Sequence, residues 1–513
     1  MPRRIAELEP AAGRRRRVCP LRFLDITPNY NGTAMADSFD LIVIGTGPAG
    51  QKAAVQAAKL GRRVLAVEKG GQVGGACVHS GTIPSKALRQ VALILSGVRS
   101  RRLQGVRLSW HDSLGLGDLV SYTSEIVSTE TAIVTDQLRR NGVELVYGTA
   151  RFDAPETVIV SRDGAEQPYS ADRIIIATGA APMRPPEVPF DGERIHDYES
   201  LLSLRRIPKR LVVVGAGVIG TEYACMFAAL GCEVELLDRR RELLNFLDRE
   251  IAEALAYHLW SSGVKLRLGE DVGRIEKQGE EVRVTLISAE EILCDTLLHC
   301  QGRVAATASL ALEKAGLQAG PGGLIQVDAN YRTAVPHIYA VGDVIGFPSL
   351  ASTSMEQGRI AAGHAFGVQA ESFPHLLPFG LYTIPEISMV GRSETELTRD
   401  GVPYASGRAH YREIARGQLV GDSEGLLKLL FHRENRKLLG VHAIGEGATE
   451  LIHIGQAVMA FGGEVDYFVA NVFNYPTFAE CYRVAALDGI NRSGLARRGV
   501  PEGPSPVPSE PPS

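Results

Sequence analysis

Glycines recur with the same spacing at two places in the chain. Residues 41–50 read Leu-Ile-Val-Ile-Gly-Thr-Gly-Pro-Ala-Gly, and residues 211–220 read Leu-Val-Val-Val-Gly-Ala-Gly-Val-Ile-Gly. In such a G-x-G-x-x-G turn, the first glycine permits a sharp bend, the second lets the backbone approach a pyrophosphate, and the third lets the next helix pack closely. The free N–H groups and positive dipole end of that helix favour phosphate. Each segment is therefore a candidate phosphate-binding turn.

An acidic residue follows each turn at the same distance along the chain. Glu68 and Asp238 each end a second apolar run, which comes after a stretch that predicts a helix. A carboxylate at this position can accept a hydrogen bond from a ribose hydroxyl. One glycine motif alone is weak evidence, because glycine-rich turns also occur for packing. Two copies with strand, helix and acid in register predict two dinucleotide sites.

The elements around both turns predict an α/β fold. Residues 172–179 and 337–343 each resemble a buried strand that ends in a small or acidic residue, at the edge where open α/β sheets place ligands. The second glycine segment lies between other α/β patterns, so we expect one domain to be inserted into another. From about residue 373 the pattern changes to α+β, with expected strands at 425–431 and 438–444 and expected helices at 447–462 and 477–490.

Composition excludes several classes of function. The chain has 513 residues, is 45% hydrophobic and 22% charged, and carries a net charge of −4, so nothing favours nucleic acid or an anionic membrane. No apolar run approaches the length of a membrane span. The seven cysteines are scattered and odd in number, which argues against a secreted disulfide framework. None has the spacing of metal ligands beside histidines, so we expect no metal site and a cytoplasmic protein.

Both ends of the chain have the composition of extensions outside the fold. Residues 1–34 are rich in Arg and Pro and lack the apolar segment of a secretory signal. A transit peptide remains an alternative, although three acidic residues argue against it. We expect disorder here, or translation from Met35 instead. Residues 499–513 are rich in Pro and Ser and are also expected to be disordered.

Over about residues 39–492 the chain resembles the flavoprotein disulfide reductases, the class I pyridine nucleotide-disulfide oxidoreductase family. The markers stand here as Gly45-x-Gly47-x-x-Gly50, Gly74-Gly-Ala-Cys77, Pro84-Ser-Lys86, Ala177-Thr-Gly179, Gly302-Arg303 and Val341-Gly-Asp343. The resemblance implies two Rossmann-like domains, one for FAD and one for NAD(P), and a C-terminal α+β dimerisation domain. The implied boundaries are 1–38 extension, 39–189 FAD domain, 190–306 NAD(P) domain, 307–373 FAD domain continued, 374–492 dimerisation domain and 493–513 tail.

The resemblance also implies which residues bind the two dinucleotides. The implied cofactor-binding residues are Gly45, Gly47, Pro48, Ala49, Gly50, Glu68, Lys69, Gly74, Gly75, Ala76, Cys77, Lys86, Ala150, Thr178, Gly179, Gly215, Gly217, Val218, Ile219, Gly220, Asp238, Arg239, Arg240, Gly302, Arg303, Gly342, Asp343 and Ala351. Lys86 is implied to lie on the helix under the flavin, with Glu222 as its partner, and both are candidate catalytic residues. An ammonium near flavin N5 would stabilise the anionic reduced flavin.

Two groups that a disulfide reductase needs are missing. The family's second thiol position, which completes C-x-x-x-x-C with Cys77, is Thr82 here, and a hydroxyl cannot form a disulfide. The family's proton-shuttling His, paired with a Glu, is replaced by Tyr475, while Glu480 is retained. An ordinary tyrosine, with a pKa near ~10, is a poor proton shuttle at neutral pH. Both losses affect the same half-reaction, so dithiol chemistry is expected to be absent.

The remaining chemistry is hydride exchange between a flavin and nicotinamides. Within the family the chain is most similar to the transhydrogenases, at residues 77–89, 247–248 and 473–477. We therefore expect ping-pong transfer in which NADPH reduces flavin N5 and NAD⁺ then collects the hydride. The alternative is another FAD-dependent NAD(P)H oxidoreductase that reduces a quinone or oxygen. A non-catalytic flavin subunit or redox sensor is disfavoured, because the glycines of residues 215–220 are intact.

Residues 237–241, Leu-Asp-Arg-Arg-Arg, bear on the choice of nucleotide. The acid Asp238 suits the ribose hydroxyls of NAD, and adjacent arginines suit the 2′-phosphate of NADP. Arg239 and Arg240 are preferred over Arg241, and a solvated arginine run is the alternative. Cys77 is expected to be a packing group beside the flavin, and His79 is a weaker candidate for the nicotinamide site. The family implies a homodimer in which Tyr475 faces the flavin of the other subunit.

Overall fold

The computed structural model describes residues 37–100, 116–204, 206–368 and 375–495. The predicted disordered ends, 1–34 and 499–513, lie outside these residues. The chain folds as two compact units. Unit 1 combines Met1–Val78, Ser128–Ala180 and Val304–Glu371, and unit 2 combines His79–Val127, Ala181–Arg303 and Ser372–Ser513.

Unit 1 is built on a seven-stranded sheet that carries the first glycine turn. The strands run in the order β3-β2-β1-β6-β5-β4, and β17 also pairs with β6. β1, β2, β3, β6 and β17 are parallel, whereas β4 and β5 extend the sheet as antiparallel strands. The strands are β1 (Asp37–Ile44), β2 (Val64–Glu68), β3 (Glu144–Tyr147), β4 (Thr149–Ala154), β5 (Thr157–Arg162), β6 (Ala165–Ile176) and β17 (Ile338–Ala340).

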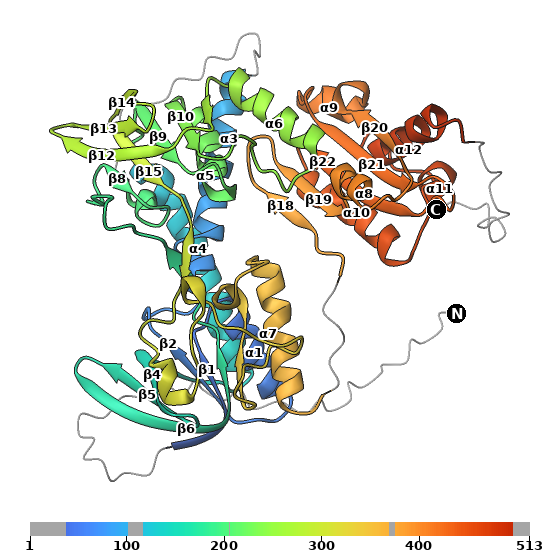
Figure 1. The fold of residues 1–513 in the computed structure, drawn as a ribbon. Coiled ribbons are helices and arrows are strands. Elements are labelled where there is room, and N and C mark those ends of the chain that lie inside the picture. The colour runs from blue at the N-terminus through green and yellow to red at the C-terminus, as the bar shows by residue number, and fades with distance from the viewer. Residues whose placement is uncertain (1–36, 101–115, 205, 369–374, 496–513) are drawn as a thin grey trace, which may run out of the picture. The chain divides into compact units, whose positions relative to one another are not determined.

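Two helices pack against each other in unit 1, as Figure 1 shows in blue and orange. α1 (Pro48–Lys59) begins at the first glycine turn, and α7 (Ala351–Ala365) lies beside it. A Cβ on Gly358 of α7 would stand 2.1 Å from the carbonyl oxygen of Ala49, so only glycine permits this approach. α2 (Gly75–His79) ends one residue beyond the part of the chain assigned to unit 1, and α4 (Leu116–Arg140) contains residues assigned to both units. Unit 1 also contains three 3₁₀ turns: η2 (Leu312–Ala315), η3 (Pro321–Gly323) and η4 (Gly342–Ile345).

Unit 2 repeats the Rossmann pattern on a five-stranded parallel sheet. Its order is β11-β10-β9-β15-β8, with the second glycine turn after β9 in the middle. A three-stranded antiparallel sheet, β12-β13-β14, packs on one face of it through a shared apolar core. The strands are β8 (Ile195–His196), β9 (Arg210–Val214), β10 (Glu233–Asp238), β11 (Lys265–Leu268), β12 (Val272–Gln278), β13 (Glu281–Leu286), β14 (Glu291–Cys294) and β15 (Thr296–His299). Its helices are α3 (Thr82–Ser100), α5 (Val218–Ala229) and α6 (Arg249–Ser261), with η1 (Ser200–Ser203).

The C-terminal part of unit 2 is an antiparallel sheet with helices. The strand order is β18-β19-β22-β21-β20. The strands are β18 (Phe379–Leu381), β19 (Ile387–Gly391), β20 (Tyr404–His410), β21 (Leu426–His432) and β22 (Leu438–Ile444); the helices are α8 (Glu394–Arg399), α9 (Ala415–Val420), α10 (Ala448–Ala460), α11 (Asp466–Ala470) and α12 (Glu480–Arg492), with η5 (Tyr411–Glu413). Two short strands, β7 (Ala180–Pro182) and β16 (Arg303–Ala305), lie where the chain passes between units.

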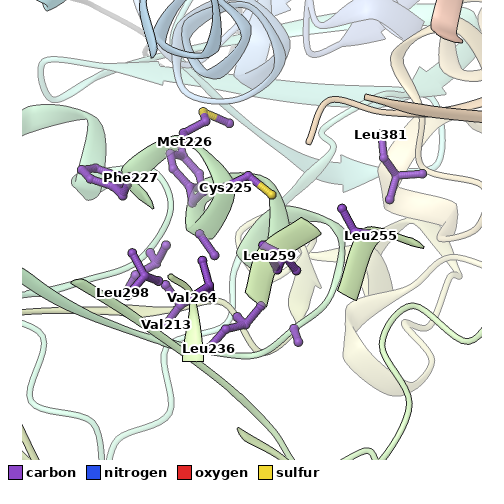
Figure 2. Packing of buried hydrophobic residues seen from close by; sticks show 14 of the residues in the cluster. Val213, Cys225, Met226, Phe227, Leu236, Leu255, Leu259, Val264, Leu298 and Leu381 are labelled. Atoms are coloured by element: carbon purple, nitrogen blue, oxygen red, sulfur yellow. The ribbon is translucent and has the colours of Figure 1, made fainter. Parts of the chain in front are cut away.

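One apolar core joins the parallel sheet of unit 2 to its C-terminal sheet. Figure 2 shows part of it: Val213 and Leu298 from the parallel strands lie near residues of α5 and α6, and Leu381 comes from β18. α3 contributes Leu88 and Ala92 to the same core. The burial of these side chains fixes α3, α5 and β18 against one another. This packing matters below because α3 and α5 carry the two members of an ion pair, and the residue that follows β18 contacts that pair.

The predicted fold class is confirmed, with α/β layers around both glycine turns and an α+β segment at the C-terminal end. The expected strands at 425–431 and 438–444 correspond to β21 and β22, and the expected helices correspond to α10 and α12. No helix among the described residues is long and apolar enough to cross a membrane.

Candidate dinucleotide sites

The first turn, residues 45–50, has the backbone geometry that a bound pyrophosphate needs. Gly45 has φ +100°, a conformation that favours glycine, and its N–H donates to the carbonyl of Val67 on β2 at 2.8 Å. A Cβ on Gly50 would lie 1.9 Å from the Gly45 oxygen, so only glycine fits at this position in the first turn of α1. A Cβ on Gly47 would meet nothing closer than 3.9 Å, which leaves open space beside the backbone.

The second turn, residues 215–220, repeats this geometry. Gly215 has φ +107° and donates to Leu237 of β10 at 2.8 Å. A Cβ on Gly220 would again lie 1.9 Å from the oxygen of the first glycine, while one on Gly217 would have no neighbour within 4 Å. α1 and α5 both begin without a side-chain cap, so their first N–H groups remain available to a phosphate.

The acid after each turn binds that turn's backbone in the same way. Glu68 accepts from the Thr46 N–H at 3.1 Å, from the Thr46 hydroxyl and from the Gly70 N–H at 2.8 Å. Asp238 accepts from the Ala216 N–H and the Arg240 N–H, each at 2.8 Å. Each carboxylate is thus held at the carboxyl edge of its sheet, beside the turn, where a ribose would lie next to the pyrophosphate.

Arg240 also binds Asp238 through its side chain. The guanidinium donates from Nε to Oδ1 at 2.9 Å and from Nη2 to Oδ2 at 2.7 Å. Burial alone would raise the pKa of Asp238, but the hydrogen bonds from Arg240 and Ala216 lower it below the ordinary value. Arg239 is exposed and makes no ion pair within the described part of the chain. Arg241 packs its side chain near Gly269. The free protein therefore has one arginine on the acid and one at the surface.

Lys86 and Glu222, the two predicted catalytic residues, form an ion pair. Lys86 Nζ lies 2.7 Å from Glu222 Oε2, with Lys86 on α3 and Glu222 on α5. The Glu222 side chain is only 6% exposed. Its second oxygen, Oε1, accepts the backbone N–H of Tyr382 at 2.8 Å. The pairing that the resemblance implied is thus present, and the contact with Tyr382 adds a segment that the sequence reasoning missed.

The other predicted cofactor residues lie mainly at strand ends and helix starts. Gly74 has φ +122°, Gly75, Ala76 and Cys77 belong to α2, and a Cβ on Gly75 would stand 2.8 Å from Cα of Gly47. Thr178 and Gly179 follow β6, Gly342 and Asp343 open η4, and Ala351 opens α7. Lys69 is exposed after β2, Ala150 is buried on β4, and Pro48 and Ala49 form the start of α1. In unit 2, Val218 and Ile219 start α5, and Gly302 and Arg303 follow β15.

Unit 1 has two further polar features that sequence reasoning did not find. Thr46, inside the first turn, is 1% exposed and carries the hydrogen bonds to Glu68. Gln357 on α7 is buried, and its Oε1 accepts the Gly342 N–H at 2.8 Å, which fixes the turn after β17. No local motif marks a Gln on a later helix as the partner of a glycine. A side chain of this kind could have been found only from the tertiary packing.

The cysteines do not supply a second reactive thiol in the described structure. Burial raises the pKa of Cys225, Cys232, Cys294 and Cys481 to about 12, and it raises the pKa of Cys300 further. Cys77 is partly exposed on α2, and Thr82 begins α3. Tyr475 is 72% exposed in the single chain. The Oε2 atom of Glu480 is buried and has no hydrogen-bond partner among the described residues.

The site in unit 1 fits a dinucleotide such as FAD. The open space beside Gly47, the uncapped start of α1 and the carboxylate of Glu68 supply the groups that a pyrophosphate and a ribose need. The hydroxyl of Thr178 is buried with no partner among the described residues, so it has hydrogen-bonding capacity left for a ligand. The described residues contain no group of three or more His, Cys, Asp or Glu that could hold a metal ion.

Comparison with known proteins agrees with this geometry. Residues 39–358 match the family model described as pyridine nucleotide-disulphide oxidoreductase, and residues 377–486 match the dimerisation domain of the same family. Similar curated proteins include the soluble pyridine nucleotide transhydrogenase of Mycobacterium bovis, 49% identical over 88% of this chain and 97% of that protein. The protein of that name from Vibrio parahaemolyticus is 45% identical over 90% of this chain and 99% of its own length.

Solved structures with the same fold include one from Mycobacterium tuberculosis and one from Escherichia coli. LpdA from Mycobacterium tuberculosis has a TM-score of 0.82 and is 26% identical, over 88% of this chain and 99% of that one. The HOCl-induced flavoprotein disulfide reductase RclA from Escherichia coli, as its Cu(II) complex, has a TM-score of 0.80 and is 27% identical, with the same coverage. With the family model matched over more than half of its length, the chain belongs to the pyridine nucleotide-disulphide oxidoreductase family.

Proposed function

We propose that this protein transfers hydride from NADPH to NAD⁺ through bound FAD, without a redox-active disulfide. The observation that carries the proposal is the combination of two complete dinucleotide turns with Thr82 at the position of the second thiol. The relatives named soluble pyridine nucleotide transhydrogenase, at 45% and 49% identity, support it. FAD, when bound, can accept a hydride from one nicotinamide and release it to another.

Some residues of the chain would bind the two dinucleotides, and others would supply charge beside the flavin. The first turn would hold the FAD pyrophosphate and Glu68 the adenosine ribose. The second turn would hold NAD(H) or NADP(H) in exchange, with Asp238 for a ribose hydroxyl and Arg239 and Arg240 for a 2′-phosphate. Lys86, oriented by its ion pair with Glu222, would offset the negative charge of the reduced flavin.

A homodimer and a cytoplasmic location are part of the same proposal. The dimerisation domain supports the dimer, as do the exposed Val472 and Tyr475 between α11 and α12, which are 89% and 72% exposed in the single chain. In that arrangement Tyr475 would face the flavin of the partner subunit. The word soluble in the names of the relatives supports the location.

An anaerobic acceptor assay tests the reaction. Purified holoenzyme is mixed with NADPH and thio-NAD⁺, whose reduced form absorbs at its own wavelength, and lipoamide, a quinone and oxygen are offered in parallel. We expect fast reduction of thio-NAD⁺ and no reduction of lipoamide. Fast quinone or oxygen reduction without transfer to thio-NAD⁺ would replace the proposal with an NAD(P)H:quinone or oxygen oxidoreductase.

A further inference from the structure

The connector between β18 and β19 reaches the Lys86–Glu222 pair within unit 2. This connector, residues 382–386, belongs to the segment matched by the dimerisation-domain model. The backbone N–H of Tyr382 occupies Glu222 Oε1, so both carboxylate oxygens of Glu222 are engaged. The Tyr382 ring centroid also lies 4.9 Å from Lys86 Nζ, within the range of a cation–π contact. Tyr382 therefore contacts both members of the pair, Glu222 through its backbone N–H and Lys86 through its ring.

Arg89 in turn fixes the connector. It lies one helical turn after Lys86 on α3, and its side chain is 11% exposed. Its Nε donates to the carbonyl of Thr383 at 2.9 Å, and its Nη2 lies 3.4 Å from Glu386 Oε2. One guanidinium thus holds both ends of the connector, which the planar, multi-donor shape of arginine permits and the single ammonium of lysine does not.

Glu386 ties the connector to the next helix. Its Oε1 accepts the N–H and the hydroxyl of Thr449 at the start of α10, each at 3.3 Å. Its backbone carbonyl accepts the Gly445 N–H at 2.9 Å. Burial lowers the pKa of Arg89 from its ordinary value, while the charges of Glu386 and Glu222 oppose that effect, so the arginine remains charged at neutral pH. The connector is therefore held by Arg89, Thr449 and Gly445 in addition to its contact with Glu222.

We propose that Arg89 and Tyr382 are positioning residues that fix the Lys86 ammonium, and that the C-terminal domain of the same chain thereby sets the charge beside the flavin. The effect on the charge beside the flavin rests on the proposed role of Lys86. The positioning of Lys86 rests only on contacts within unit 2. Neither residue touches a reacting atom in this proposal, because both act through Lys86 and Glu222.

Chemical labelling of Lys86 in the flavin-free protein tests whether Arg89 and Tyr382 position its ammonium. An amine-reactive reagent is applied in limiting amount, and modification of Lys86 is followed by peptide mass spectrometry. Loss of a charge-assisted hydrogen bond typically shifts a conformational equilibrium by about an order of magnitude or more, so Arg89→Met should label Lys86 roughly tenfold faster. Tyr382→Leu keeps the backbone N–H and removes only the cation–π contact, so it should label Lys86 roughly two- to fivefold faster. Tyr382→Phe keeps the ring and the backbone N–H and should label as the wild type does.

Two further variants serve as controls for folding. Arg89→Lys retains a cation near Glu386 and should recover part of the slow labelling. Arg399→Met removes an exposed arginine of α8 that pairs with Asp400, and it should leave Lys86 labelling unchanged. Wild-type labelling rates in Arg89→Met and Tyr382→Leu, with the fold intact by circular dichroism, would overturn the positioning role.

The reduction potential of the flavin in the holoenzyme tests whether this positioning sets the charge beside the flavin. A tenfold weaker preference for the reduced flavin corresponds to about 30 mV in a two-electron couple, so Arg89→Met should make the midpoint potential more negative by about that amount. Lys86→Met should shift it in the same direction by at least as much. If Lys86→Met shifts the potential and Arg89→Met does not, the inference is wrong while the proposed role of Lys86 stands. If Lys86→Met has no effect, the proposed role of Lys86 fails, and the labelling result alone decides the positioning.

Discussion

At the scale of single residues, the pair of Asp238 and Arg240 bears most directly on nucleotide choice. In the free protein Arg240 neutralises the carboxylate that a ribose hydroxyl would use. A 2′-phosphate would compete with Asp238 for this guanidinium, whereas a ribose hydroxyl would have to replace one of the four N–H donors that already occupy the two oxygens of Asp238. The two nucleotides thus require different partners for Arg240, and Arg239 offers a second cation at the surface.

Replacement of Arg239 and Arg240 by neutral residues should therefore separate the two nucleotides. We expect the double variant Arg239→Gln, Arg240→Gln to lose affinity for NADPH by ten- to a hundredfold, about 1.4–2.8 kcal/mol, because charge-assisted contacts to phosphate are lost. NADH should change by less than about threefold, a difference well under 1 kcal/mol. Equilibrium binding by fluorescence titration measures both values. Equal losses for NADH and NADPH would contradict dual recognition by this segment.

Cys77, the partly exposed thiol of α2, gives a second prediction at this scale. With Thr82 in place of a second cysteine, only the flavin can store electrons, so anaerobic titration with dithionite should reach full reduction after roughly one two-electron equivalent per flavin. Cys77→Ser should keep transfer from NADPH to thio-NAD⁺ within about a factor of three of the wild type, since a packing substitution of similar volume has a small effect. Uptake of a second equivalent, or loss of transfer in Cys77→Ser, would restore a redox role to Cys77.

At the scale of elements, the two glycine turns show which parts of a site can be predicted from sequence. The turn geometry follows from local chemistry, because φ near +100° and a 1.9 Å Cβ clash restrict the positions to glycine. The strands, helices and acids that follow each turn also depend on local sequence, so the glycine motif and the apolar pattern were sufficient to predict them. Tyr382 could not be predicted, because its contact with Glu222 joins positions 160 residues apart. Gln357 could not be predicted either, because no local motif marks it as the partner of Gly342. The side-chain bond from Arg240 to Asp238 was also missed, since a strand-end acid gives no sign of which neighbour turns back onto it.

Alanine at two glycines of the second turn should have two different effects. Gly220→Ala places a methyl group against the Gly215 carbonyl and should cost about 1–3 kcal/mol of stability as well as nucleotide binding. Gly217→Ala has open space around it and should change the free energy of unfolding by no more than about 0.5 kcal/mol. It should nevertheless weaken NADPH roughly tenfold or more, because the methyl group fills the approach of the pyrophosphate. Denaturant unfolding and NADPH titration separate the two effects, and FAD content should be unchanged in Gly217→Ala.

At the scale of the whole molecule, a buried charge cluster joins the parallel sheet and the C-terminal sheet of unit 2. Lys428 on β21 is 0% exposed and lies 2.8 Å from Asp248, 3.1 Å from Glu250 and 3.1 Å from Glu394. Asp248 caps α6 by accepting the Glu250 N–H, and Arg408 donates to Glu250 at 2.7 Å. Buried charges need such partners, so each element of this junction depends on the others.

Lys428→Met should therefore destabilise the protein by about 3–5 kcal/mol, because it leaves the buried carboxylate of Asp248 without its cation. Arg249→Met, which removes an exposed ion pair on the same helix α6, should cost no more than about 1 kcal/mol. Urea unfolding of both variants measures the difference. Similar small losses would show that the buried cluster does not hold the two sheets together.

The same cluster predicts how stability depends on pH. Burial opposes ionisation of Asp248 and Glu250, but Lys428, His442 and Arg408 outweigh it and lower both pKa values. Their contribution should be complete above the ordinary values of 3.8 and 4.5 and should be lost as pH falls through the lower folded-state values. For Lys428, burial is outweighed by Asp248 and its neighbours, and the pKa is raised, so its contribution fades only above the ordinary 10.5. In Lys428→Met the acid-side loss should begin at a higher pH, as unfolding curves between pH 3 and 7 would show.

The open space beside Gly47 and Gly217 has a consequence for how this protein can diverge. The surface that would grip a pyrophosphate consists of backbone N–H groups and of room that no side chain fills. Most substitutions cannot alter such a surface, since they change side chains and leave the backbone in place. Proteins that descend from this one would therefore keep phosphate binding while residues 238–241 change. A preference for one nucleotide could be gained or lost at those residues without any change in either turn.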